Sequence, residues 1–317
     1  MKMNIQTIPE VISYLEARGC LDITHTLDVN SCDQYPTSTG GFGDVYRARL
    51  TNGTFVAVKI IRLELDHARE DKKYIKHAVK ELYTWSKCQH RHIQKLLGLA
   101  YFKNQLGMVS VWQAKGNLSE YIRHRPQIER HRLSAQVAEG LSYLHQNGVI
   151  HGDLKASNVL VSEEGAPLLA DFGNAILHQY TLKFTNTSPK SAISIRWAAP
   201  ELMNDTEGTY TAEADVYALG MTILVRVHTL KMAQGDEIPA QETITGKVPW
   251  KETPDMAVMM SVAVKKEHPK RPESQIPYDT YGNRMWSLLT WSWAYQPQDR
   301  PRAEQVTNEM WAIALDQ

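Results

Sequence analysis

Cysteine is scarce in this chain of 317 residues, which contains three: Cys20, Cys32 and Cys88. Three scattered cysteines cannot form a disulfide framework or supply the four ligands of a structural zinc site. An odd and sparse count is typical of proteins in a reducing compartment.

An excess of charge and a long hydrophobic run are also missing. The 35 basic and 35 acidic residues give a formal net charge of zero, which excludes binding to nucleic acid or membranes by bulk charge. The longest apolar run, residues 216–225, has half the length that crosses a bilayer, and residues 1–6 lack the apolar core of a signal peptide. We therefore expect a cytoplasmic or nuclear protein without a transmembrane segment.

The composition that remains is that of a globular protein, with 43% hydrophobic and 22% charged residues. The length is sufficient for one large domain or for two lobes. Composition does not indicate a partner, so function must be inferred from local motifs.

One polar segment, His151-Gly152-Asp153-Leu154-Lys155-Ala156-Ser157-Asn158, lies between two apolar runs, 148–150 and 159–161. Such runs predict short strands, which places the polar residues on a tight loop. Asp171-Phe172-Gly173 follows shortly afterwards. Magnesium prefers oxygen ligands and is typically held by one or two carboxylates together with substrate phosphates. The spacing therefore indicates a site for phosphate and a divalent cation.

This constellation resembles the catalytic loop and the metal-binding triplet of protein kinases. The resemblance covers residues 36–315, with six motifs in the order of the family. It implies an α+β, bilobal fold with a β-rich N-lobe at about 36–112 and a larger, mostly helical C-lobe at about 116–315. Residues 1–35 form an N-terminal extension, in which residues 9–17 have the pattern of a short amphipathic helix with Pro9 at its start and Gly19 beyond its end.

The resemblance also implies a role for each residue of the site. Asp153 accepts the proton of the substrate hydroxyl and Lys155 lies against the γ-phosphate, while Asn158 and Asp171 bind Mg²⁺. The residues expected to bind ATP are Ser38, Thr39, Gly40, Gly41, Phe42, Gly43, Val45, Ala57, Lys59, Glu81, Ser110, Val111, Trp112 and Gln113. Structural or regulatory roles fall to His151, Phe172, Gly173, Ser194, Glu201, Asp215 and Arg300.

Two details of the expected ATP site follow from the residues themselves. Asn52-Gly53 between apolar runs predicts a hairpin after the glycine loop, although Ser38 stands where the family has its first glycine. Lys59 lies in an apolar strand, residues 54–61, where an ammonium group is costly unless it meets a negative charge such as phosphate.

Substrate class is indicated by the neighbours of Asp153. Lys155 and Ser194 are typical of Ser/Thr kinases, whereas Ile195-Arg196-Trp197 resembles tyrosine kinases. This mixture resembles the tyrosine-kinase-like group, a Ser/Thr-specific branch, and its expanded fungal members in particular. The partners implied are protein substrates. The alternatives are a pseudokinase that acts as a nucleotide-binding scaffold, a tyrosine or dual-specificity kinase, and a small-molecule kinase.

Two departures from the family pattern concern regulation and gene structure. Gly152 replaces the arginine that binds a phosphorylated activation segment, here residues 174–198. Residues 225–241 form a seventeen-residue insertion after an expected buried helix. Val225-Arg226 can be encoded with the GT start of an intron and Gln241 with its AG end, so we interpret the segment as an unspliced intron; a real loop is the alternative. Transcripts that always retain these codons would contradict the intron.

Overall fold

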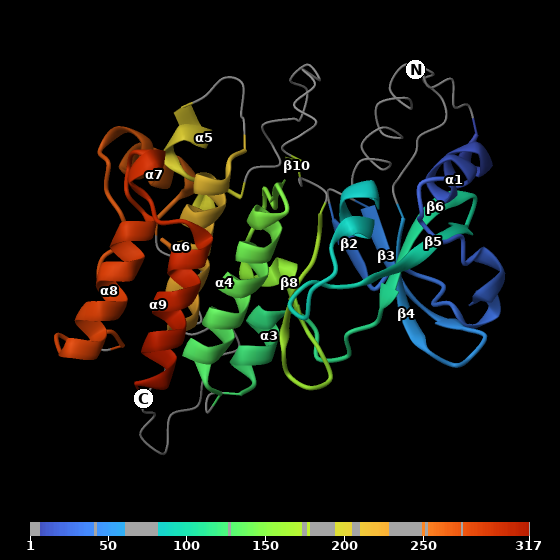
Figure 1. Ribbon diagram of the computed structural model, residues 1–317, viewed down its shortest axis with the longest axis horizontal. Helices are drawn as coiled ribbons and strands as arrows, with labels where there is room; N and C mark the ends of the chain where they lie inside the picture. Colours follow the sequence, from blue (N-terminus) through green and yellow to red (C-terminus); the bar gives the residue numbers. More distant parts are fainter. Residues whose placement is uncertain are drawn as a thin grey trace. The chain divides into compact units, whose positions relative to one another are not determined.

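The computed structural model describes residues 7–40, 43–60, 82–125, 128–172, 176–177, 194–204, 210–227, 249–250, 253–273 and 275–316 (Figure 1). The chain divides into two compact units. The first comprises residues 1–113 and 172–175, and the second residues 114–171 and 176–317. The first is built on a β-sheet and the second is mainly helical, which confirms the predicted α+β, bilobal kinase fold.

The first unit contains an antiparallel sheet in the order β1-β3-β4-β6-β5, with β2 paired to β3. Its strands are β1 (Leu27–Asp28), β2 (Ser38–Gly40), β3 (Gly43–Leu50), β4 (Phe55–Ile60), β5 (Leu96–Phe102) and β6 (Gln105–Val111). The predicted hairpin at Asn52-Gly53 is confirmed, because it connects β3 to β4 and Gly53 has a φ of +88°. Such a backbone conformation favours glycine.

Strand β4 has one fully buried face rather than two. Val56, Val58 and Ile60 are buried in a core cluster that also contains Tyr46 and Val109. Side chains alternate along a strand, so Lys59 lies on the other face with Ala57 and is only half-buried. Lys59 therefore lies on a partly exposed face of β4 and not inside a strand that is buried throughout.

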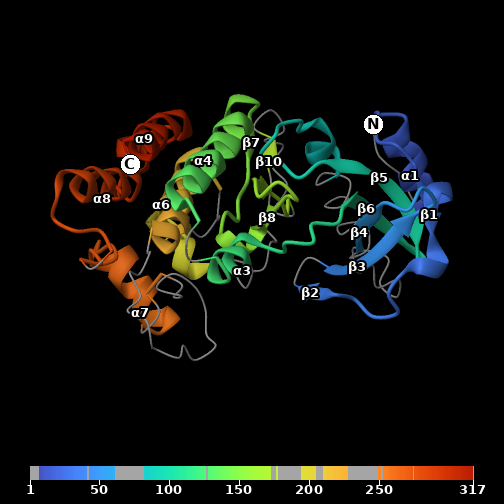
Figure 2. The ribbon, with the colours of Figure 1, turned by 90° about the horizontal axis from the view of Figure 1, so that it is seen from below.

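The N-terminal extension packs on this sheet. Helix α1 (Ile8–Glu16) lies against β5, and its bounds match the predicted helix to within one residue (Figures 1 and 2). Thr7 and Glu10 form a capping box at its N-terminus. After α1, the N–H of Ile23 donates to the carbonyl of Leu99 at 2.8 Å, and the N–H of Leu99 donates to that of Leu21 at 2.7 Å. The extension therefore adds a short parallel pairing to the edge of β5.

Gly98 offers a test of this docking. A Cβ atom at this position would lie 2.5 Å from the carbonyl oxygen of Leu21 and 3.0 Å from Ile23 Cγ2. We expect Gly98→Ala to destabilise the first unit by about 1–3 kcal/mol, the cost of an overpacked contact. Native-state hydrogen exchange should become faster at the amides of Ile23 and Leu99, while the amide of Trp293 in the second unit serves as the control. Unchanged protection at Ile23 would contradict tight docking.

The second unit is organised around α4 (Arg130–Gln146), which packs against α6 (Ala212–Val227) and α9 (Ala303–Leu315) (Figure 1). Around them lie α3 (Leu118–Arg123), α5 (Pro200–Asn204), α7 (Asp255–Met259), which continues as a π-helical turn, and α8 (Thr280–Ser292). Two antiparallel pairs of strands complete it: β7 (Val149–Ile150) with β10 (Ile176–Leu177), and the hairpin of β8 (Val159–Val161) with β9 (Pro167–Leu169).

Helices α3 and α4 are separate elements, and residues 126–127 between them lie outside the described residues. Residues 214–224 of α6 are buried as predicted for this helix, and the last three residues of α6 extend into the insertion 225–241. The rest of the insertion, residues 228–241, lies outside the described residues.

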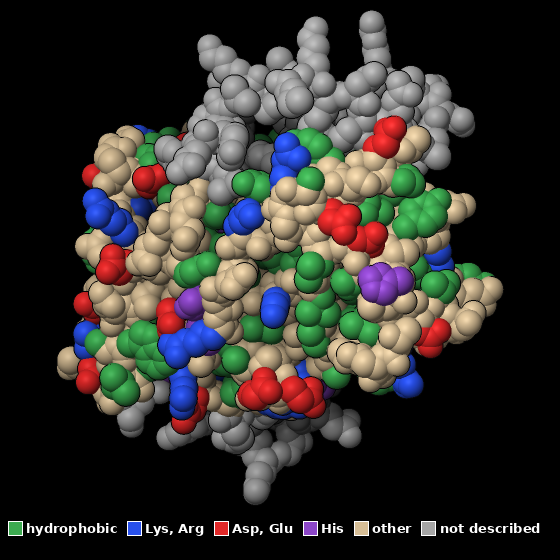
Figure 3. Space-filling model, turned by 45° about the vertical axis from the view of Figure 1, so that its right-hand side comes forward, with side chains coloured by type: hydrophobic (Ala, Val, Ile, Leu, Met, Phe, Trp, Pro, Cys, Tyr) green, Lys and Arg blue, Asp and Glu red, His purple; other side chains and the backbone are tan. Residues whose placement is uncertain are grey.

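The described surface has no dominant sign of charge on the face shown in Figure 3, where basic and acidic side chains are interspersed. Within the described part of the chain, no helix combines the length and apolarity needed to cross a lipid bilayer.

Candidate active site

The polar loop after β7 is anchored by a buried carboxylate of α6. The backbone N–H groups of His151 and Gly152 donate to Asp215 at 2.7 and 2.9 Å. Gly152 has a φ of +79°, which suits glycine at this turn. Asp215 also lies 3.0 Å from Nε2 of His145 on α4. Three partners satisfy both oxygens of this buried carboxylate, which therefore fixes the start of the loop.

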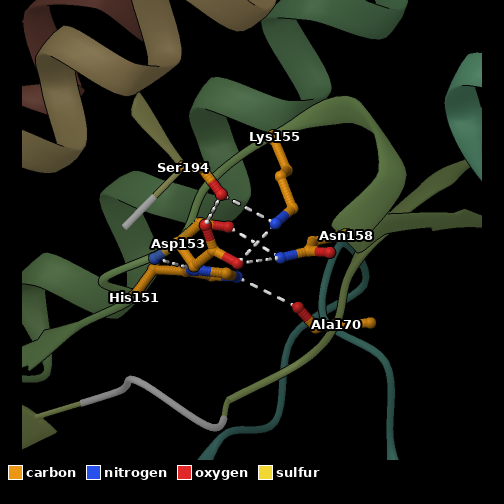
Figure 4. Close-up of polar contacts among 6 residues, drawn as sticks. All are labelled: His151, Asp153, Lys155, Asn158, Ala170 and Ser194. Atoms are coloured by element: carbon orange, nitrogen blue, oxygen red, sulfur yellow. Dashed lines mark hydrogen bonds and ion pairs between the residues drawn. The ribbon is translucent and has the colours of Figure 1, made fainter. Parts of the chain in front are cut away.

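The His151 ring ties this loop to the segment before Asp171. The N–H of Asp153 donates to Nδ1 of His151 at 3.3 Å, so Nδ1 is the acceptor and Nε2 carries the proton. Nε2 then donates to the carbonyl of Ala170 at 3.1 Å (Figure 4). The next residue, Asp171, has a φ of +63°, a conformation that is uncommon outside glycine.

The Asp153 carboxylate receives hydrogen bonds from three side chains (Figure 4). Lys155 Nζ and Asn158 Nδ2 donate to Oδ2 at 2.8 and 2.9 Å. The Ser194 hydroxyl donates to Oδ1 at 2.7 Å, and its oxygen accepts from Lys155 Nζ at 2.8 Å. The Asp153 side chain is 7% exposed, so these contacts hold its carboxylate in one orientation.

Asn158 has a second contact that bears on metal binding. Its Nδ2 also donates to the backbone carbonyl of Asp153 at 2.8 Å. With the amide nitrogen turned toward Asp153, the side-chain oxygen of Asn158 is available for another partner. Asn158 and Asp171 offer oxygen donors, the type that Mg²⁺ prefers, and Mg²⁺ sites commonly use few protein ligands. In the described residues no group of three His, Cys, Asp or Glu side chains could hold a metal alone.

Tyr210 lies beside this loop and was not identified from the sequence. It lines a small cavity with Asp153, Ser194 and Asp215. Burial raises the pKa of the Tyr210 hydroxyl, and the carboxylates of Asp153 and Asp215 raise it further. Tyr210 therefore stays protonated and neutral next to the two carboxylates. No local sequence signal marks it.

A second hollow, of about 370 Å³, opens next to Lys155. Its lining residues are Lys155, Ser157, Ser194, Ile195, Arg196, Trp197 and Asp255. Arg196 shapes one wall, because its guanidinium donates to the carbonyls of Pro249, Trp250 and Thr253 and pairs with Asp255 at 2.8 Å. The hollow begins at Lys155 and Ser194, the two side chains that contact the Asp153 carboxylate.

Arg300 and Glu201 form a separate buried pair in the second unit. The guanidinium donates to both carboxylate oxygens, at 2.6 and 2.7 Å, and its side chain is 0% exposed. It also donates to the backbone carbonyls of Glu213 and Ala294 at 3.0 and 2.8 Å. This pair joins α5 to α6 and to the segment that precedes α9.

In the first unit, the sheet brings several expected ATP-binding residues together. Val45 is paired with Lys59 across β3 and β4, and Ala57 is paired with Ser110 across β4 and β6. Directly paired side chains lie on the same face, so these four share the face opposite the core cluster. Ser38, Thr39 and Gly40 lie in β2 and Gly43 begins β3, while Trp112 and Gln113 follow β6.

Of the remaining residues expected in the site, Phe172 is described by the structure and four others are not. Phe172 is buried and stacks on Trp85, with ring centroids 5.7 Å apart. Gly41, Phe42, Glu81 and Gly173 lie outside the described residues, so the expected Lys59–Glu81 pair is not described.

A family model described as "Protein kinase domain" matches residues 38–312. The match begins after α1 and after the Leu21–Ile23 pairing with β5, so the docked extension lies outside it.

The chain is also similar to proteins named as kinases. It is 37% identical over 194 residues to the L-type lectin-domain containing receptor kinase I.3 of Arabidopsis thaliana, covering 58% of this chain and 27% of that protein. Serine/threonine-protein kinase BCK1/SLK1/SSP31 of Saccharomyces cerevisiae is 27% identical (84% of this chain, 17% of that protein). Serine/threonine-protein kinase STY46 of Arabidopsis thaliana is 25% identical (88% and 43%). The chain thus spans 17 to 43% of the length of these relatives.

Proposed function

The chain belongs to the protein kinase family, and from this premise we propose that it transfers the γ-phosphoryl group of ATP to serine and threonine hydroxyls of protein substrates. The observation that carries the proposal is the Asp153 carboxylate, held by Lys155, Asn158 and Ser194 beside an open hollow. Enzymes of this type position their reactants and stabilise charge rather than form covalent intermediates.

Each residue of the loop has a defined task in this proposal. Asp153 orients the incoming hydroxyl and accepts its proton, while Lys155 places a positive charge beside the transferred phosphoryl group. Asn158 and Asp171 hold Mg²⁺, which neutralises phosphate charge when it is bound. In the first unit, Lys59 binds the α- and β-phosphates, and the glycine-rich segment 38–43 contributes backbone N–H groups to the phosphates.

Specificity for serine and threonine rests on Ser194. Its hydroxyl forms hydrogen bonds with both Asp153 and Lys155, and Ser194 also lines the hollow in which a polypeptide substrate would lie. Ser194 would therefore hold the Asp153 and Lys155 side chains in place beside the substrate. Two of the relatives described above are named serine/threonine-protein kinases. Membership of the tyrosine-kinase-like group and a cytoplasmic or nuclear location belong to the same proposal.

The experiment is incubation with Mg²⁺, labelled ATP and a generic protein substrate, followed by phosphoamino-acid analysis. Phosphoserine and phosphothreonine are expected. Label on tyrosine would replace the proposal with a tyrosine or dual-specificity kinase. Binding of ATP without any phosphoryl transfer would favour the pseudokinase alternative. Two features of the sequence point to that alternative: Ser38 in place of a glycine, and the insertion at residues 225–241.

Gly152 bears on whether phosphorylation of the activation segment regulates the kinase. A phosphate bound to the activation segment is usually paired with an arginine guanidinium, and here that position holds a glycine whose N–H is engaged by Asp215. The candidate phosphosites Thr185, Thr187, Ser188 and Ser191 lie outside the described residues. We expect phosphatase treatment to change kinase activity by less than about twofold. Heat-inactivated phosphatase is the control, and abolished activity would contradict the prediction.

A further inference from the structure

Gln94 is a buried amide that precedes β5 and is 1% exposed. Its Nε2 donates to the backbone carbonyl of Val111 at 2.7 Å. Its Oε1 accepts a hydrogen bond from Nε2 of Gln113 at 2.9 Å. All three residues belong to the first unit, and none of the motifs in the sequence includes Gln94.

The direction of this hydrogen-bond chain is set by the carbonyl of Val111, which can only accept. A flipped Gln94 amide would place two oxygens against each other, so Nε2 must face Val111 and Oε1 must face Gln113. Gln113 in turn must present its Nε2. The two bonds therefore fix the orientation of the Val111 carbonyl and of the Gln113 side chain together.

Gln94 is itself held in place by the surrounding sheet. The indole N–H of Trp85 donates to the Gln94 carbonyl at 2.5 Å, and two residues later Leu96 pairs with Ser110. A buried amide is costly unless its polar atoms are bonded, and here Nε2 and Oε1 both have partners. A polar group, rather than an apolar side chain, thus adjoins the Val111–Trp112 peptide.

We propose that Gln94 is a positioning residue for the base of the nucleotide. The inference rests on the proposed function, in which residues 111–113 bind adenine. A carbonyl oxygen has two lone pairs, so Gln94 occupies one on Val111 and leaves the other for the amino group of the base. Without Gln94, the Val111 carbonyl and the Gln113 side chain would lose the partner that fixes their orientation, and the cost of orienting them when the nucleotide binds would appear as weaker binding.

The test compares a nucleotide with a ligand that has phosphates but no base. Gln94→Met keeps a long, unbranched side chain and removes both hydrogen bonds. We expect its Kd for Mg-ATP to rise about tenfold, as for the loss of one to two net hydrogen bonds, with kcat at saturating ATP unchanged. Binding of inorganic tripolyphosphate with Mg²⁺, measured by the same calorimetry, should match that of the wild type.

Gln105→Met is the matched control, because it makes the same change at the start of β6, six residues before Val111; wild-type Kd values are expected. Gln94→Glu provides a second variant, which keeps an acceptor for Gln113 but places an acceptor against Val111. It should weaken ATP binding at least as much.

Wild-type affinity for Mg-ATP in both Gln94 variants would overturn the inference, and so would equal losses for ATP and tripolyphosphate. A wild-type protein that binds no Mg-ATP would instead refute the proposed function.

Discussion

Replacing Asp153 with asparagine is expected to lower kcat for phosphoryl transfer by about 10³-fold, within the range for loss of a positioned general base. Asparagine has nearly the same size, and its side-chain oxygen can still accept from Lys155 and Asn158. Its amide cannot accept the proton of the substrate hydroxyl. The KM for ATP and the thermal unfolding temperature should therefore stay close to those of the wild type.

The matched control for this variant is Asp279→Asn. Asp279 caps the N-terminus of α8, where it accepts from the N–H of Gly282, and asparagine is an equally good cap. Its activity should equal that of the wild type. If Asp153→Asn kept more than about a tenth of wild-type kcat, the role given to Asp153 would be wrong.

The second large effect concerns stability. We expect Arg300→Ala to destabilise the second unit by about 3–5 kcal/mol, because it leaves the Glu201 carboxylate unpaired in a partly buried site. It also removes the donor to the carbonyls of Glu213 and Ala294. Differential scanning calorimetry should show a Tm lower by roughly 10 °C.

Arg284→Ala is the matched control for the loss of an arginine. Arg284 pairs with Glu309 and Asp316 at 3.1 and 2.8 Å, but its side chain is 39% exposed, and exposed ion pairs contribute about 0–1 kcal/mol. Its Tm should change by at most about 3 °C. Equal Tm losses in the two variants would show that burial of the Arg300 pair does not determine its contribution.

Local sequence patterns predicted the elements whose cause is local. Pro9 and Gly19 marked the ends of α1, Asn52-Gly53 turns the chain between β3 and β4, and the apolar runs on either side of the polar loop form β7 and β8. Capping, turn conformation and periodicity act within a few residues, so they can be read without the fold. The family resemblance of residues 36–315 likewise depended on the spacing of motifs along the chain.

Burial was predicted less well than the elements themselves. The apolar run around Lys59 indicated a buried strand, whereas one face of β4 is not fully buried. Whether a face is covered depends on what packs on it, which is information that the strand does not contain.

The sequence by itself determined the order of motifs, the two-part α+β organisation and the residue types available for phosphate and metal chemistry. Only the tertiary structure decided which groups meet: Gln94 with Val111, His145 with Asp215, Tyr210 with the cavity beside Asp153, and Leu21 with β5. These contacts join residues 17 to 78 positions apart in the chain, and strand register and helix packing set them. Register and packing minimise the free energy of the whole fold, so no short stretch of sequence specifies them.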